Sequence, residues 1–164
     1  MKTGRLVLIL LLFVAGAAAA HHGRLQEHLL SAQVISAGRY ADATAGFVRT
    51  AAHSAVDRSA VLVEETDRVP LRLGERFGFC FELTGFLEDG EADLQKIVTH
   101  PSVAVDDRAI DGYVDTIELS VINGGAAGCI GHAVDTDREL IPGKWTIGLG
   151  AGETTLVERT FMLE

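Results

Sequence analysis

The chain has 164 residues, of which 48% are hydrophobic and 23% charged, and its formal net charge is −9 at pH 7. This composition is typical of one globular domain and excludes a disordered tail or a collagen-like rod. An acidic protein repels phosphate backbones and anionic lipids, so we do not expect nucleic acid among its partners.

The first 20 residues have the features of a secretory signal peptide. A cationic start precedes an unbroken apolar run over residues 6–14, and Ala18 and Ala20 supply the small residues of a cleavage site. From residue 6 to Ala20 the stretch is 15 residues long, which is shorter than the ~20 residues of a spanning helix. We therefore expect cleavage after Ala20, no membrane span after processing, and a periplasmic or secreted protein. Cleavage removes two basic residues and no acidic ones, which changes the net charge from −9 to −11.

The rest of the chain predicts an all-β protein. Residues 21–32 show only a weak helical spacing and are expected to form a short N-terminal arm, with or without a helical turn. Residues 41–54 are interpreted as a connection, residues 102–108 as a polar loop, and residues 87–90 and 123–125 as turns. Short alternating runs predict eight strands, at residues 33–40, 59–69, 76–83, 92–99, 113–122, 128–134, 144–149 and 155–163. The strand at 92–99 is expected to stop at His100 and Pro101. Their spacing is typical of a sandwich or barrel, and we expect one antiparallel β-sandwich domain over residues 33–164.

Two cysteines in an oxidising compartment suggest one disulfide, Cys80–Cys129. In the strand at 76–83 three phenylalanines share one face and Cys80 lies on the other; in the strand at 128–134 Ile130 and Val134 share a face that excludes Cys129. Both thiols are therefore expected on the polar faces of their strands. That placement permits a bridge within one sheet and argues against a bridge through the core, and two unpaired thiols remain the alternative.

Three stretches of the chain, at residues 68–79, 139–147 and 156–161, resemble an uncharacterised bacterial family, domain of unknown function 3859. The resemblance covers residues 34–163. It implies an exported, immunoglobulin-like sandwich of seven to eight strands with no assigned activity. The chain departs from the family before Asp135, where His132 and Val134 stand in place of an expected aromatic pair. The two cysteines also look particular to this chain.

The sequence contains no pattern that predicts catalysis. It lacks the Gly-x-Ser-x-Gly motif of hydrolases. Cysteine chemistry needs a thiolate beside a histidine, but Cys129 and His132 are three positions apart on one predicted strand and so point to opposite faces. We therefore expect a non-catalytic protein and assign no catalytic or cofactor-binding residues.

Two groups of residues in the predicted sandwich could bind a metal ion or have purely structural roles. Exported proteins often bind calcium through carboxylates, and four aspartates lie close together in the sequence: Asp106, Asp107, Asp111 and Asp115. Their spacing does not match an EF-hand, and a solvated acidic loop is the preferred interpretation. Zinc would need more ligands than His100 and His132. His132 shares its face with Ile130, which favours a core histidine. Trp145 alternates with apolar residues and is likewise interpreted as a core residue.

Copper is the alternative with the clearest chemistry. Cleavage after Ala20 leaves His21 first and His22 second, and a free α-amine with imidazole nitrogens suits Cu(II). These residues precede the first predicted strand, and such an arm is poorly placed to hold a rigid geometry. The sequence thus favours an exported binding or structural module with an unidentified protein or small-ligand partner. A periplasmic copper protein using His21 and His22 is the second hypothesis.

Overall fold

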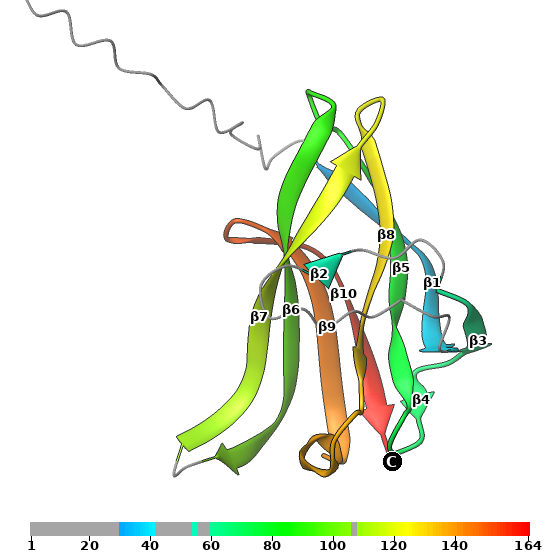
Figure 1. The fold of residues 1–164 in the computed structure, drawn as a ribbon, viewed down its shortest axis with the longest axis vertical. Helices are drawn as coiled ribbons and strands as arrows, with labels where there is room; N and C mark the ends of the chain where they lie inside the picture. The colour runs from blue at the N-terminus through cyan, green and yellow to red at the C-terminus, as the bar shows by residue number, and fades with distance from the viewer. Residues whose placement is uncertain (1–29, 42–53, 56–59, 106–107) are drawn as a thin grey trace, which may run out of the picture.

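A computed structural model describes residues 30–41, 54–55, 60–105 and 108–164, and most of these belong to strands (Figure 1). The elements are β1 (Ser31–Tyr40), β2 (Ser54–Ala55), β3 (Leu62–Glu65), β4 (Arg68–Val69), β5 (Arg76–Thr84), β6 (Gly90–Val105), β7 (Arg108–Val121), β8 (Gly125–Ala133), the 3₁₀ turn η1 (Asp137–Glu139), β9 (Gly143–Ala151) and β10 (Thr154–Leu163). In these parts of the chain no helix is long and apolar enough to cross a membrane.

The strands form two sheets that pack face to face (Figure 1). The four-stranded sheet has the order β3-β1-β5-β8, and the six-stranded sheet has the order β2-β7-β6-β9-β10-β4. Most neighbours are antiparallel, as predicted, but the two short edge strands are parallel additions: β4 pairs with β10 and β2 pairs with β7. The predicted all-β sandwich is therefore confirmed, with a mixed second sheet.

Alternation along the strands explains the core. The aromatic face of β5 and the apolar faces of β7 and β9 point inward because every second side chain of a strand faces the same way. Their fully buried members form one cluster between the sheets: Phe77, Phe79, Phe81, Leu83, Ile117, Leu119, Val121, Trp145, Ile147 and Leu149. The predicted inward faces of these three strands are thus correct.

The predicted end of a strand at Pro101 is wrong, because β6 continues to Val105. The β6–β7 ladder shifts register between Thr99 and Val103, and the β6–β9 ladder stops at Thr99. A proline cannot donate to a ladder, but at such an irregularity it removes no hydrogen bond. Most of the predicted polar loop at 102–108 therefore belongs to the long β6–β7 hairpin.

The predicted strand at 59–69 is two strands in different sheets. β3 pairs with β1 and β4 pairs with β10, so the chain crosses between sheets at Thr66 and Asp67. The hydroxyl Oγ1 of Thr66 accepts the amide N–H of Arg68 at 3.1 Å, a local bond that competes with a continuous ladder. β1 also begins at Ser31, inside the predicted arm, because its first residues pair with the end of β5.

Candidate functional site

The disulfide lies within the four-stranded sheet. Cys80 of β5 and Cys129 of β8 are direct partners in the antiparallel ladder, and their Cα atoms are 3.9 Å apart. Ser36 of β1 is the partner of Cys80 on its other side, so the three residues form one row on the face opposite the core. Cys129 is nonetheless only 7% exposed. The bridge therefore joins two strands of one sheet, as the alternation of the two strands allows.

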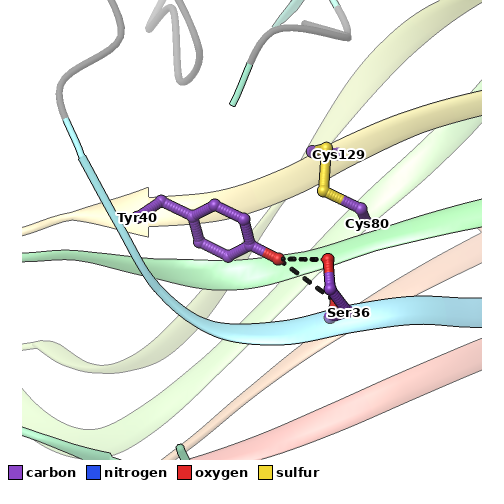
Figure 2. Close-up of a disulfide and its surroundings, with 4 residues drawn as sticks. All are labelled: Ser36, Tyr40, Cys80 and Cys129. Carbon is purple, nitrogen blue, oxygen red and sulfur yellow. Dashed lines mark hydrogen bonds between the residues drawn. A yellow bond between two sulfur atoms is a disulfide. The ribbon is translucent and has the colours of Figure 1, made fainter. Parts of the chain in front are cut away.

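Tyr40, the last residue of β1, lies beside this bridge (Figure 2). Its hydroxyl hydrogen bonds to Ser36, at 3.1 Å from Oγ and 3.2 Å from the carbonyl oxygen. Burial raises the pKa of the Tyr40 phenol, and the Ser36 hydrogen bond opposes that change. The buried Tyr40 side chain thus reaches back along its own strand to a residue four positions earlier, next to the disulfide.

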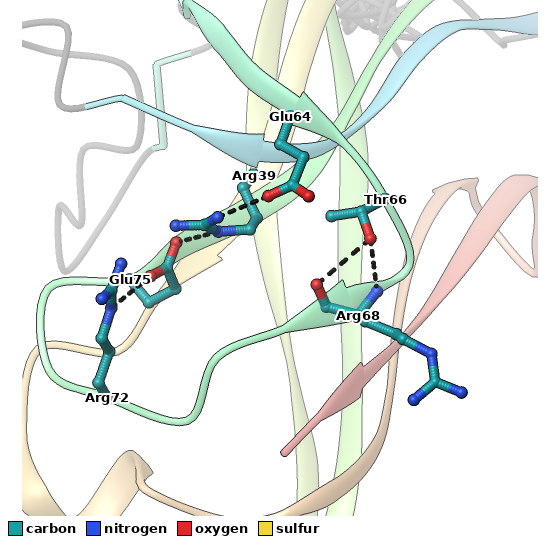
Figure 3. Close-up of polar contacts among 6 residues, drawn as sticks. All are labelled: Arg39, Glu64, Thr66, Arg68, Arg72 and Glu75. Carbon is teal, nitrogen blue, oxygen red and sulfur yellow. Dashed lines mark hydrogen bonds and ion pairs between the residues drawn. The ribbon is translucent and has the colours of Figure 1, made fainter.

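A second polar cluster joins β1, β3 and the start of β5 (Figure 3). Glu75 is only 6% exposed, and its two carboxylate oxygens accept Arg39 Nε at 2.6 Å and Arg72 Nε at 2.9 Å. Arg39 also donates to Glu64 at 2.6 Å. A buried carboxylate needs such partners because leaving it unpaired is costly. These residues stabilise the fold, since each holds neighbouring elements together.

This cluster makes stability depend on pH. Burial alone would raise the pKa of Glu75, but the bonds from Arg39 and Arg72 outweigh it and hold the pKa below the ordinary value of 4.5. A depressed pKa contributes stability that is present above the unfolded pKa and is lost as pH falls through the folded pKa. We expect Glu75→Gln to lower the free energy of unfolding by about 1–3 kcal/mol at pH 7, and by progressively less below about pH 4.5. Chemical unfolding at several pH values measures this, with exposed Glu158→Gln as the control; a constant difference for Glu75→Gln would contradict the assignment.

His132 is buried between the sheets, in the structural position that alternation predicts. Its Nδ1 hydrogen bonds to the Tyr113 hydroxyl at 3.0 Å, and its ring centroid is 4.7 Å from that of Trp145. The His100 ring also contacts Trp145, at 4.8 Å. Each imidazole thus packs on the indole, whose Nε1 donates to the carbonyl of Ile141 at 3.0 Å. Within the described ranges, no three His, Cys, Asp or Glu side chains gather as a metal site would require.

The acidic stretch is a strand rather than the expected loop. Asp111 and Asp115 both belong to β7, and Asp115 forms an ion pair with Lys96 at 3.0 Å. Four residues of a strand separate the two carboxylates by about 13 Å, too far to share one ion. Asp106 and Asp107 lie outside the described residues, as do His21 and His22 of the copper hypothesis.

Two turns meet at the end of the sandwich where β1 begins, at the top of Figure 1. They are residues 85–90, between β5 and β6, and residues 122–125, between β7 and β8, and we call them the turn pair. The carbonyl of Gly124 accepts the amides of Gly85 and Phe86, both at 3.2 Å, and the Gly124 amide donates to Asp89 Oδ1 at 3.0 Å. Two backbone–backbone bonds and one bond to a side-chain carboxylate therefore connect the two turns.

The sequence of the second turn explains this geometry. Asn123 and Gly124 have φ values of 53° and 70°, the left-handed region that asparagine and glycine tolerate. A Cβ atom on Gly124 would lie 3.0 Å from the Phe86 carbonyl oxygen, so only glycine fits without displacing the neighbouring turn. Backbone amides of Gly124 and Asn123 lower the pKa of Asp89, which keeps its carboxylate charged.

The turn pair exposes two large apolar side chains. Leu87 is 70% exposed and Ile122 is 58% exposed, while the neighbouring Phe86 packs against the core. The prediction placed both turns nearly correctly but did not identify these side chains. One signal was present: Ile122 follows the inward-facing Val121 and must point outward if alternation continues.

The fold and the comparisons define the class of protein. The chain is similar in structure to an immunoglobulin-like protein of Pseudomonas aeruginosa, with 18% identity and a TM-score of 0.59 over 85% of this chain and 99% of that one. It is therefore an immunoglobulin-like β-sandwich. Residues 32–163 match the family described as "Domain of unknown function (DUF3859)", and the chain belongs to that family, as the sequence resemblance predicts. No curated protein matches it by sequence.

Other similar structures share less. A Pseudomonas fluorescens alkylpurine DNA glycosylase bound to DNA with an abasic-site analogue is 15% identical, with a TM-score of 0.41 over 60% of this chain and 28% of that one. A Listeria innocua β-glucosidase in complex with gluconolactone is 8% identical, with a TM-score of 0.43 over 82% of this chain and 16% of that one. Likeness at this level says nothing about the activity of the present chain.

Proposed function

We propose that this protein is an exported, non-catalytic binding module that engages a partner through the turn pair. The observation that carries the proposal is a set of three hydrogen bonds between the turns. The amides of Gly85 and Phe86 donate to the Gly124 carbonyl, and the Gly124 amide donates to the Asp89 carboxylate. These bonds hold two exposed apolar side chains, Leu87 and Ile122, on a fixed backbone. A surface that is already ordered loses little conformational entropy on binding, which favours affinity.

The polar clusters support a module rather than an enzyme. Glu75 forms ion pairs with two arginines, and Asp115 forms one with Lys96. His132 packs in the core against Trp145 and Phe77. Each of these side chains contacts another part of the fold. These contacts explain why a charged or polar residue is present without invoking a substrate.

Export is supported by the leader and by the disulfide. Disulfides persist in oxidising compartments and are rare in the cytosol, and the structure joins Cys80 to Cys129. Copper binding by His21 and His22 stays an alternative proposal, and it requires that processing leave His21 at the N-terminus.

The proposal is tested in bacterial cells that express the full chain with a C-terminal tag. We expect the protein in the periplasmic or secreted fraction, a mass that corresponds to cleavage after Ala20, and no free thiol before reduction. Formaldehyde treatment of intact cells should convert part of it into a defined larger adduct. A cytosolic, unprocessed protein would contradict export, an N-terminus other than His21 would contradict the copper alternative, and a protein that stays uncrosslinked would contradict the binding role.

A further inference from the structure

The surroundings of the turn pair carry charge of one sign. Residues 82–95 and 116–127, which contain both turns and the adjoining ends of four strands, hold no Lys or Arg. Their carboxylates are Glu82, Glu88, Asp89, Glu91, Asp93 and Glu118. The next basic residue, Lys96, is only 13% exposed in its side chain and is paired with Asp115. Among the residues that the structure describes at this end of the sandwich, the surface is therefore apolar at Leu87 and Ile122 and negative around them.

We propose that the turn pair docks into an apolar pocket of a partner protein whose rim is basic. This inference rests on the proposed binding function and adds the chemistry of the partner. Interfaces typically combine a small apolar centre with a polar rim that excludes water. Here the centre is Leu87 and Ile122, and the rim is formed by carboxylates on the ends of β5, β6 and β7.

Charge complementarity distinguishes among the kinds of partner that could bind this surface. An anionic membrane or a nucleic acid would face at least six carboxylates at short range, and a second copy of this chain docked tip to tip would double that repulsion. A basic rim gains from the same charges, which speed association and suppress wrong partners. A basic protein is thus the class of partner that this end of the molecule fits.

Geometry supports a protein pocket. Leu87 and Ile122 stand on separate turns, and hydrogen bonds join these turns at Gly124, so the spacing of the two side chains depends on those bonds. A flexible apolar loop would suit many surfaces, whereas a fixed pair of side chains suits a cavity of matching shape. Gly124→Ala, which places a Cβ atom 3.0 Å from Phe86 O and strains a φ of 70°, should disturb this spacing without removing either side chain.

The experiment places a photocrosslinking amino acid next to the surface, at Asn123, in the full exported chain in living cells. The captured protein is identified by mass spectrometry and purified, and its affinity for the module is measured. We expect the double variant Leu87→Ser with Ile122→Ser to lose at least tenfold in affinity. The double variant Glu88→Lys with Glu91→Lys should lose about tenfold in low salt, and this loss should shrink in 0.5 M salt, where charges are screened.

Matched controls lie elsewhere on the same fold. Leu73→Ser removes an exposed leucine between β4 and β5, and the double variant Glu153→Lys with Glu158→Lys reverses two exposed charges on the β9–β10 hairpin. Both should bind like wild type. Circular dichroism melts of all variants establish that each is folded. Vesicles of phosphatidylglycerol or phosphatidylcholine, and sedimentation of the module alone, test a membrane and a second copy as occupants.

The possible results distinguish a partner with a basic rim from the binding function on which that inference rests. Loss in both turn-pair variants, with wild-type binding in the controls, supports the basic protein partner. Loss only in the Leu87–Ile122 variant keeps the binding surface but overturns the basic rim, and so does vesicle binding or self-association through the turns. A captured protein that binds all variants equally overturns this surface and leaves an exported binding module in place. Failure to capture any protein from Asn123 overturns the inference and the proposed use of the turn pair together.

Discussion

Replacing Phe77 by alanine is expected to lower the free energy of unfolding by about 3–5 kcal/mol, the cost of a large cavity in a rigid core. Phe77 is 0% exposed and lies where the two sheets meet. Its ring is 5.2 Å from Phe161, 5.9 Å from Trp145 and 5.8 Å from His132, all edge-to-face contacts between ring centroids. Losing the ring therefore weakens contacts to β8, β9 and β10 at once.

Urea unfolding followed by Trp145 fluorescence measures this effect, because the only tryptophan of the chain is itself in the contact. Ile35→Ala is the control, since this exposed side chain of β1 should cost no more than about 0.5 kcal/mol. If Phe77→Ala lowered the free energy of unfolding by less than about 1 kcal/mol, the sheets would not pack around this ring.

Removing the disulfide is expected to cost roughly 2–4 kcal/mol, because the bridge restricts the unfolded chain over a long loop. Cys80 and Cys129 are 49 positions apart. The variant with alanine at both positions should still fold, since the flanking pairs Phe79–Ile130 and Phe81–Gly128 keep the register of β5 and β8. Alanine is the suitable replacement because a serine hydroxyl at the nearly buried Cys129 would add a desolvation cost of its own.

The measurement compares thermal and urea unfolding of wild type and the double alanine variant, each with and without reductant. Reductant should lower the stability of the wild type toward that of the variant. It should leave the stability of the variant unchanged. Equal stability of the two oxidised proteins would show that the bridge adds nothing. A variant with no cooperative transition would show that the bridge is essential for folding, contrary to this expectation.

The sequence best predicts the features that depend on residues adjacent in the chain, such as the inward face of a strand or the position of a turn. Alternation in residues 76–83 correctly places Phe77 in the core and Cys80 outside it, because the side-chain period of a strand is a local property. The turn at Asn123 and Gly124 is predictable for the same reason, since its residue types tolerate a left-handed backbone. Pro101 misled the prediction because its tolerance depends on a register shift between two strands, which one strand's sequence does not reveal.

Local sequence patterns do not reveal which residues pair when they lie far apart in the chain. Whether Cys80 meets Cys129 depends on which strands are neighbours in the sheet, and the sequence left a bridge and free thiols equally open. The Arg39–Glu75 contact spans 36 positions and has no local signature. The turn pair has no local signature either, because its two turns become neighbours only when β5–β6 and β7–β8 meet at the same end of the fold.

The parallel pairing of β4 with β10 has a consequence for when the protein can fold. Val69 pairs with Leu163, and Arg68 bonds to Glu164 at 2.7 Å, so β10 closes a sheet edge begun 96 positions earlier. The six-stranded sheet cannot be complete until β10 has been synthesised, and contacts of such long range form slowly. The export proposed above requires a chain that is still unfolded when it enters a translocation channel, and a sheet that closes this late leaves the chain unfolded for longer.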